Sequence, residues 1–476
     1  MLKKILKPLN KSLMMACVLP VLVACQGSHL EIMPDLSDET LLTEHLSVEQ
    51  MHQDIDALLK GALERHPNLD KYTQVSELKS YTETLKSQVT QPLMRTEFYK
   101  IVGQISHKFN DGHAFLIWPY QEYNLLKEQG AKPFPFEVFI NTQQELYIQN
   151  DYQSGSERVV GQSKILSING ISTKDLVLDM QKYTGGESQF LREKVVAARF
   201  PVNLWAVYGF INEFKLEIES DGRTKTLEIT QAQDWQQTES AISGKTKKEH
   251  YFKELEDGVA LLYLEHFDIK PSEFKNFVDE SFKKINASNI HSLIIDIRNN
   301  PGGNTDTVAY LSRYLANKPF RLVSALQEKL NKDNRGWFNY KGEEGEIVDT
   351  KWDEWETPMS DDVRFTGNVY LLTGSISYSA AIVFATTLKD NGFATLVGQP
   401  TQGFANQSGQ GNLFNLPHSE LRAYITTRLL VRPSGELTQQ GVQPHYEIEP
   451  GNSITQNMDD KTIAATLELI RQKTVK

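Results

Sequence analysis

Hydrophobic positions recur with a helical period in the first part of the chain after Ser47. Apolar side chains there are spaced three, four or seven residues apart and so share one face of a helix. Pro92 bounds the second of these segments. The apolar positions are Met51, Ile55, Leu58, Leu59 and Ala62, then Val75, Leu78, Tyr81, Leu85 and Val89, then Phe98, Ile101, Val102, Ile105 and Phe109. The pattern predicts a helical module over residues 47–112.

Between residues 131 and 230 the pattern changes to short alternating runs, which are typical of half-buried strands. Phe136, Val138 and Ile140 occupy alternate positions, and residues 163–170 read as a strand that closes on an Asn-Gly turn. We therefore predict a β-rich domain over residues 113–235. Residues 231–250 are polar and charged, which indicates a linker.

From Gly258 onward, apolar strands and amphipathic helices alternate. Strands are predicted at 259–264, 293–297, 369–373 and 394–397, and helices at 274–285, 308–315 and 380–388. This alternation favours an α/β layer with helices packed on a mostly parallel sheet. We assign residues 250–455 to this core and residues 456–476 to a C-terminal helix. The pattern assigns no role to the polar, Trp-containing insertion at 330–362.

The N-terminus has the pattern of an export signal. Four lysines precede an apolar stretch from Leu13 to Ala24, which is shorter than the roughly 20 residues that a membrane anchor needs. Leu22-Val-Ala-Cys25 resembles a bacterial lipobox, which implies that residues 1–24 are removed and that Cys25 carries lipid. An ordinary cleaved signal is the alternative. Residues 25–46 then form a polar tether, and Gln26 is compatible with sorting to the outer membrane.

Composition narrows the possible partners. Removal of residues 1–24 takes away four lysines and no acid, so the net charge moves from −11 to −15. An acidic body argues against nucleic acid as a partner. Of the two cysteines, Cys17 leaves with the signal and Cys25 is the lipidation site, so stability rests on burial rather than on a disulfide. The 39% of apolar residues is ample for such cores.

A serine follows an apolar strand at the predicted start of a helix. In the segment Val369-Tyr-Leu-Leu-Thr-Gly-Ser-Ile-Ser-Tyr-Ser379-Ala-Ala, Ser379 lies where backbone N–H groups and the helix dipole favour a developing negative charge. Acyl transfer needs a hydroxyl beside such donors. A plain N-cap serine is the alternative. A second segment, residues 293–303, ends a buried strand at Asn-Asn-Pro-Gly-Gly, where the N–H of Gly302 or Gly303 can point into a site.

Together these segments resemble the S41 family of serine peptidases, the tail-specific or C-terminal-processing peptidases. The resemblance rests on Ile-Asp-Ile-Arg-Asn-Asn-Pro-Gly-Gly303, Ser-Tyr-Ser379-Ala-Ala, Val-Gly-Gln-Pro-Thr-Gln-Gly403 and Gly441-Val-Gln-Pro in that order. It implies a PDZ-like fold for the β-rich domain, carried by Ile-Leu-Ser-Ile-Asn-Gly170, and a crotonase-like, ClpP-type catalytic core. The expected fold is thus an α/β multidomain protein.

The general base distinguishes two branches of that family. One branch has a lysine about 25 residues after the serine, but this position is Phe404, and no lysine occurs between Lys389 and Lys461. The other branch, which resembles the tricorn protease core, takes a histidine from far upstream. His113 in Asn-Asp-Gly-His-Ala-Phe-Leu looks like that histidine, and imidazole accepts a proton readily at neutral pH.

The third catalytic group is left open by the resemblance. The tricorn-like branch has a carboxylate shortly before Gly-Val-x-Pro, and Glu436 is the nearest acid here, while Thr438 is closer to the expected position. Either Glu436 reaches His113, or Thr438 or a water molecule orients the imidazole. His445 replaces an aspartate of the family and reads as structural.

We therefore expect a serine peptidase that forms an acyl-enzyme. Ser379 would be the nucleophile, His113 the base and Glu436 the orienting acid, with N–H groups of Gly302 or Gly303 and of Ala380 as oxyanion donors. No cofactor is required, and no His or Cys cluster has metal-ligand spacing. The substrate would be a peptide or unfolded protein. The protein would be lipid-anchored in the cell envelope of a Gram-negative bacterium, at the outer membrane facing the periplasm. The competing hypotheses are a peptide-binding lipoprotein that has lost turnover and an esterase.

Overall fold

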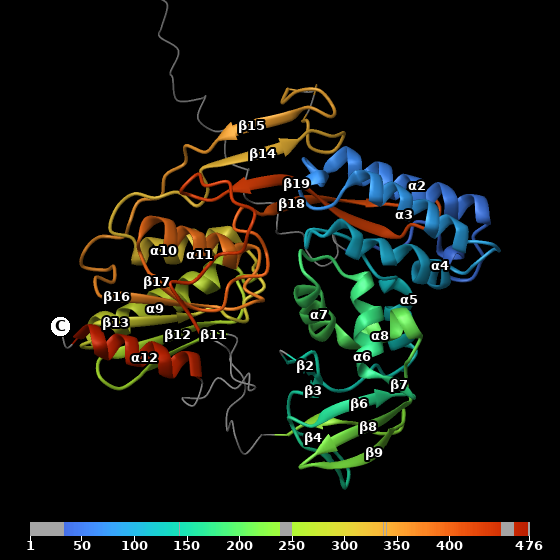
Figure 1. Cartoon of the computed structure of the whole chain (residues 1–476), viewed down its shortest axis with the longest axis horizontal. Helices are drawn as coiled ribbons and strands as arrows, with labels where there is room; N and C mark the ends of the chain where they lie inside the picture. Colours follow the sequence, from blue (N-terminus) through green and yellow to red (C-terminus); the bar gives the residue numbers. More distant parts are fainter. Residues whose placement is uncertain are drawn as a thin grey trace, which may run out of the picture.

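A helical module and a β-rich unit lie on the same side of an α/β core in the computed structural model (Figure 1). The structure describes residues 33–141, 143–238, 250–336, 338, 340–448 and 461–474. The predicted signal peptide, Cys25, the first part of the tether and most of the predicted linker lie outside these residues. No helix in the described ranges is both long and apolar enough to span a membrane.

The helical module begins where the sequence pattern predicted it. Ser47 caps the first helix through a capping box with Gln50. The third predicted helix is α-helical only as far as Val102 and continues as a 3₁₀ helix to Phe109, where Asn110 ends it in the left-handed conformation. The elements are η2 (Glu39–Leu42), α2 (Val48–Arg65), η3 (Leu69–Lys71), α3 (Val75–Gln88), α4 (Arg95–Val102), η4 (Gly103–Phe109) and α5 (Tyr120–Glu128).

The β-rich unit is an antiparallel sheet covered by helices. The order is β2-β3-β6-β8-β9, with β7 paired to β6, and a small sheet β10-β4-β5 lies beside it. Its strands are β2 (Val138–Ile140), β3 (Leu146–Ile148), β4 (Tyr152–Ser154), β5 (Glu157–Val159), β6 (Lys164–Ile168), β7 (Ile171–Ser172), β8 (Phe214–Ser220), β9 (Arg223–Ile229) and β10 (Gln236–Gln237). Its helices are α6 (Thr173–Met180), η5 (Gln181–Tyr183), α7 (Gln189–Ala198) and α8 (Phe200–Tyr208). The sequence pattern predicted strands where β2 and β6 lie, but it did not predict these helices.

The α/β core is a sheet of order β11-β12-β13-β16-β17-β20, in which the strands after β11 are parallel to one another. Ala260 and Leu262 pack under the helices α9, α10 and α11, whereas Val259 and Leu261 face α12. The strands are β11 (His250–Glu254), β12 (Val259–Leu264), β13 (Ser292–Asp296), β16 (Asn368–Thr373), β17 (Thr395–Gly398) and β20 (Tyr446–Glu447). The helices are α9 (Pro271–Ala287), α10 (Thr305–Leu315), α11 (Ala380–Asn391) and α12 (Lys461–Thr474). Burial on both faces explains the continuous apolar runs of β12 and β13.

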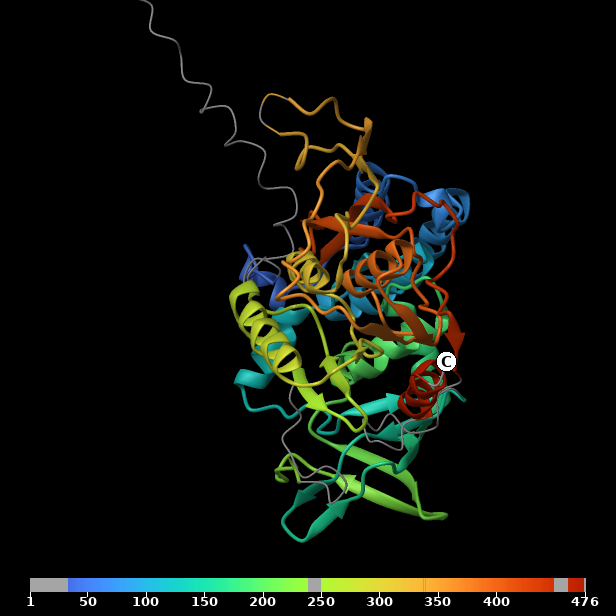
Figure 2. The same cartoon turned by 90° about the vertical axis from the view of Figure 1, so that its left-hand side faces the viewer.

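A further antiparallel sheet, here called the bridging sheet, joins the core to the helical module (Figure 1). Its order is β1-β19-β14-β15, with β18 on the other edge of β19. It consists of β1 (Ala114–Leu116), β14 (Ala325–Lys329), β15 (Ile347–Lys351), β18 (Ser408–Asn415) and β19 (Arg422–Val431). Helix α2 packs against β18 and β19. Most of the insertion at 330–362 thus belongs to the β14–β15 hairpin, which extends away from the body of the protein at the top of Figure 2.

The bridging sheet determines where His113 lies. The residues directly after His113 form β1, which pairs with β19 over Ala114↔Ile425. The predicted start of the β-rich domain at residue 113 therefore coincides with a strand of a different sheet. Because β19 lies between the core strands β17 and β20 in the chain, this pairing brings the upstream histidine beside the core.

Candidate active site

Ser379 lies at the turn between β16 and α11, immediately before the first residue of the helix. Its backbone has φ 52° and ψ −121°. Residues other than glycine rarely adopt this conformation, which costs on the order of 1–3 kcal/mol. The turn is held on both sides of the serine. The N–H of Tyr378 donates to the carbonyl of Asn300 at 3.0 Å, and Nε2 of Gln407 donates to the carbonyl of Ser379 at 2.9 Å.

Gly302 and Gly303 allow the backbone to approach this serine. A Cβ on Gly302 would stand 2.6 Å from the Cβ of Ser379 and 2.9 Å from the nitrogen of Ala380, so only glycine fits there. The N–H of Gly302 donates to Oδ1 of Asn300 at 2.9 Å. The N–H groups of Gly303 and Ala380 have no acceptor within the described part of the chain. Of the predicted oxyanion donors, the structure therefore leaves Gly303 and Ala380 available and engages Gly302.

His113 faces Ser379 despite the 266 positions between them. Nε2 of His113 is 3.2 Å from Oγ of Ser379. The backbone around His113 is held at two points: its N–H donates to Oδ1 of Asp111 at 2.8 Å, and its carbonyl accepts from the N–H of Thr426 at 2.9 Å. The side chain is 13% exposed, so the imidazole is shielded from water but still reaches the serine.

A hydrogen-bonded chain on the other side of the ring determines which nitrogen carries the proton. Oγ of Ser408 is 3.0 Å from Nδ1 of His113 and donates to Oδ1 of Asp111 at 2.5 Å. Since the hydroxyl hydrogen of Ser408 is directed at the carboxylate, its oxygen accepts from Nδ1–H. Nε2 of His113 is then unprotonated and can accept the proton of Ser379.

The helical module supplies the last member of this chain. Nε2 of His66 is 3.0 Å from Oδ2 of Asp111, and Nδ1 of His66 accepts from the N–H of Asn68 at 3.1 Å. The proton of His66 is therefore on Nε2 and is directed at Asp111. Tyr72, from the same module, accepts from the N–H of Ser408 at 2.9 Å through its hydroxyl. The helical module thus fixes both groups behind the imidazole.

The charges of these groups follow from their surroundings. Burial alone would raise the pKa of Asp111, but the hydrogen bond from His66 and the nearby imidazoles hold that pKa below its ordinary value. Burial lowers the pKa of His113, and the charge of Asp111 offsets this in part. At neutral pH the arrangement is therefore an ionised Asp111 behind a neutral His113, which is the state that general-base catalysis requires.

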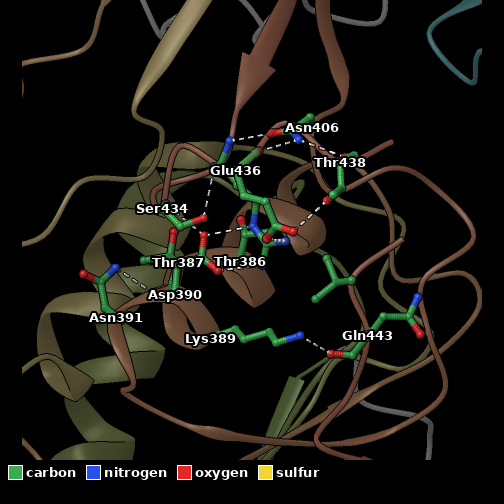
Figure 3. Close-up of polar contacts among 12 residues, drawn as sticks. Thr386, Thr387, Lys389, Asp390, Asn391, Asn406, Ser434, Glu436, Thr438 and Gln443 are labelled. Atoms are coloured by element: carbon green, nitrogen blue, oxygen red, sulfur yellow. Dashed lines mark hydrogen bonds and ion pairs between the residues drawn. The ribbon is translucent and has the colours of Figure 1, made fainter. Parts of the chain in front are cut away.

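Glu436 does not occupy the predicted place behind His113. Its carboxylate pairs with Nη1 of Arg432 at 3.2 Å and accepts from the hydroxyl of Thr438 at 3.1 Å. Figure 3 shows Glu436 beside Thr438, Asn406 and Ser434, close to Asp390. Arg432 is 7% exposed and also binds Asp390 at 2.6 Å, so the buried guanidinium retains the acid. The expectation that Glu436 or Thr438 orients the imidazole is corrected: Ser408 contacts it.

Phe404 and His445 both make structural contacts. Phe404, at the position of the absent lysine, packs against Tyr72 with 5.6 Å between the ring centroids and 39° between the ring planes. His445 accepts from the N–H of Leu396 at 2.9 Å through Nδ1, which is a structural contact. Within the described ranges no group of His, Cys, Asp or Glu has the arrangement of a metal site. The sequence signalled Asp111 weakly, as the acid two residues before His113, whereas nothing marked Ser408 or His66.

A cavity of about 520 Å³ opens at the serine. Ser379, His113 and Gly303 line it on one side, and His266 and Asp268 also contribute to its wall. A volume of this size accommodates several residues of an extended chain or a small ligand. Ser379, His113 and Gly303 therefore line the same accessible space.

Comparison with known proteins connects this geometry to a family. Residues 258–448, from β12 to β20, match the family model described as peptidase family S41. The chain carries a peptidase family S41 domain. It is a serine-type peptidase by that domain.

The S41 domain as matched contains Ser379, both glycines and Ser408, but not His113, Asp111 or His66. His113, Asp111 and His66 therefore come from chain segments that precede the domain.

The fold as a whole is similar to solved structures over most of the chain. Mature CPAF complexed with lactacystin has a TM-score of 0.64 at 16% identity, covering 90% of this chain and 98% of that one. Mature CPAF alone gives 0.64 at 16%, with 89% and 97% covered. The CPAF s499a mutant gives 0.63 at 15%, with 84% and 93% covered. At such identities the likeness concerns the fold alone.

Proposed function

We propose that the protein hydrolyses peptide bonds through an acyl-enzyme formed on Ser379. The observation that carries this proposal is the 3.2 Å contact between Oγ of Ser379 and Nε2 of His113 at the start of α11. His113 takes the serine proton as Oγ attacks the carbonyl carbon, and later gives it to the leaving amine. Water then attacks the acyl-enzyme with His113 again as base.

The N–H groups of Gly303 and Ala380 are the proposed oxyanion hole. Both are free of acceptors in the described chain, and Gly302 brings the backbone against the serine. Two preorganised donors stabilise the tetrahedral oxyanion at no cost of reorganisation. The ionised Asp111, acting through Ser408, stabilises the imidazolium that forms on His113 during the attack.

The substrate class that we propose is a peptide or an unfolded protein. The S41 domain and the fold support it, and the β-rich unit is a candidate PDZ-like module for holding an extended chain by strand addition. We further propose that Cys25 is lipidated and anchors the enzyme in the envelope of a Gram-negative bacterium, at the outer membrane. The support for this anchoring is the lipobox-like sequence.

A fluorophosphonate probe tests the catalytic proposal. We expect labelling of the wild-type protein, none in Ser379→Ala, and strongly slowed labelling in His113→Ala. Cleavage of an unstructured protein such as β-casein should follow the same order, whereas a lipid ester should be a poor substrate. A wild-type protein that binds β-casein without labelling or cleavage would instead identify a peptide-binding lipoprotein.

A further inference from the structure

Glu187 lies beside the active site but belongs to the β-rich unit, in the loop between η5 and α7. The two glycines before it let this loop lie directly on the segment that carries Asp111. A Cβ on Gly185 would stand 2.5 Å from the carbonyl oxygen of Asp111. Oε2 of Glu187 is buried and has no hydrogen-bond partner among the residues that the structure describes. A buried carboxyl oxygen without a partner is costly and calls for an explanation.

The other oxygen of this carboxyl group holds Tyr378, the residue before the nucleophile. The hydroxyl of Tyr378 donates to Oε1 of Glu187 at 2.9 Å. The ring of Tyr378 stacks on the imidazole of His113, with 5.1 Å between the centroids and 27° between the planes, and its hydroxyl is 3.4 Å from Nδ1. Tyr378 therefore packs against one face of the His113 ring.

Two glycine residues leave the space that the side chain of Tyr378 occupies. A Cβ on Gly112 would collide with the Tyr378 hydroxyl, and a Cβ on Gly403 would collide with its ring. The tyrosine is thus confined by the chain segment that carries His113, by the loop at Gly403 and by Glu187. The hydroxyl donates to Glu187 at 2.9 Å, whereas its contact with Nδ1 of His113 is longer, at 3.4 Å. Glu187 therefore determines where the edge of the ring points.

We propose that Glu187 is a positioning residue for the peptidase reaction: by holding the Tyr378 hydroxyl, it keeps the tyrosine ring stacked on His113 and the imidazole directed at Ser379. This inference rests on the proposed function of Ser379 and His113. Glu187 does not touch the reacting atoms, so its effect is on the geometry of the base and appears in turnover rather than in substrate binding.

The charge state of Glu187 fits this role. Burial and the nearby charge of Asp111 raise the pKa of Glu187 to about 8. The charged or titratable groups that face it are Asp111, Tyr378, Tyr72 and Arg192. At pH 7 the carboxyl group is therefore mostly protonated, so it holds the tyrosine without competing with Asp111 for the imidazolium. Glutamine mimics this neutral form.

The test compares Glu187→Gln, Glu187→Ala and Tyr378→Phe in labelling by a fluorophosphonate and in cleavage of β-casein at pH 7. We expect Glu187→Gln to keep kcat within about twofold, and Glu187→Ala to lose about 10- to 100-fold in kcat with KM nearly unchanged, as expected for a misplaced catalytic group. Tyr378→Phe should lose a similar factor. The double variant Glu187→Ala/Tyr378→Phe should be no slower than either single variant, because both remove the same hydrogen bond.

Glu193→Ala is the matched control. Glu193 lies on α7, is 2% exposed and also has a buried oxygen without a partner, but it binds Gln144 and Gln189 rather than Tyr378. Its loss should lower stability without lowering kcat of the folded protein. Equal kcat values for Glu187→Ala and Glu193→Ala would refute the positioning role. So would a double variant in which the decreases in kcat caused by Glu187→Ala and Tyr378→Phe multiply. Neither result would affect the labelling of Ser379. A wild-type protein that neither labels nor cleaves would overturn both proposals.

A second readout is the pH dependence of stability. The pKa of Glu187 is raised in the folded protein, so the folded state binds more protons than the unfolded state between about pH 4.5 and 8. The contribution of Glu187 to the free energy of unfolding therefore decreases as pH rises through this window. Glu187→Gln should lack this part of the pH dependence. Urea unfolding of both proteins at pH 5 and pH 8 measures the difference. Equal slopes in the two proteins would contradict the neutral state of Glu187.

Discussion

Ser408→Ala is the most direct test of how the base is oriented. The substitution removes the hydroxyl that accepts from Nδ1 of His113 at 3.0 Å and donates to Asp111 at 2.5 Å. A neutral hydrogen bond contributes about 1 kcal/mol and one to a charged group about 1.5–3 kcal/mol. Both strengthen as the imidazole becomes charged in the transition state. A loss of about 2.5–4 kcal/mol corresponds to a decrease in kcat of about 70- to 900-fold.

The assay is steady-state cleavage of β-casein or a fluorogenic peptide, with KM measured separately. Ser312→Ala is the control, because Ser312 is also fully buried, lies on α10, and its hydroxyl has no partner in the described part of the chain. We expect Ser312→Ala to retain full kcat and Ser408→Ala to retain the fold, as judged by thermal unfolding. If folded Ser408→Ala kept kcat within about twofold of the wild type, the chain from His113 to Asp111 would not orient the base.

Further predictions concern Glu436, Gly302 and the pKa of His113. Glu436→Gln should leave kcat within about threefold and lower thermal stability, because Glu436 pairs with Arg432 and not with His113; a loss of kcat as large as that of a base variant would restore it as the orienting acid. Gly302→Ala should abolish measurable labelling of Ser379, since a Cβ there would stand 2.6 Å from that of the serine and φ is +107°; an active Gly302→Ala protein would mean that the turn is not rigid. The acidic limb of the pH profile of kcat/KM should lie below pH 6.5, because burial lowers the pKa of His113 and activity is lost only as pH falls through that value; a limb above pH 7 would argue against the neutral buried base.

Local sequence patterns were sufficient to predict the buried strands and helices of the α/β core. The strand predicted at 259–264 is β12 with the same bounds, and the helix predicted at 380–388 is α11, which begins directly after Ser379. A continuous apolar run between turn residues marks β12 as a strand buried on both sides. The apolar run that follows the Gly/Ser turn marks α11, in which all residues from Ala380 to Leu388 are buried. The helices α6, α7 and α8 were missed, since the alternation of the flanking strands dominated the interpretation of residues 113–235.

Some residues of the candidate site could likewise be predicted from the sequence, whereas others were found only in the structure. The sequence by itself predicted Ser379 at a helix start, the glycine segment after a buried strand and the absence of the lysine, because each depends on neighbours along the chain: a strand, a turn and a helix start. The residue that contacts Nδ1 of His113 could not be predicted from neighbours along the chain. Ser408 is 295 positions away from the histidine, and it meets the ring only because β1 and β18 lie on the two edges of β19. Side chains brought together by sheet pairing leave no local periodicity, so tertiary structure alone decided that Ser408 and Asp111, rather than Glu436, lie behind the base.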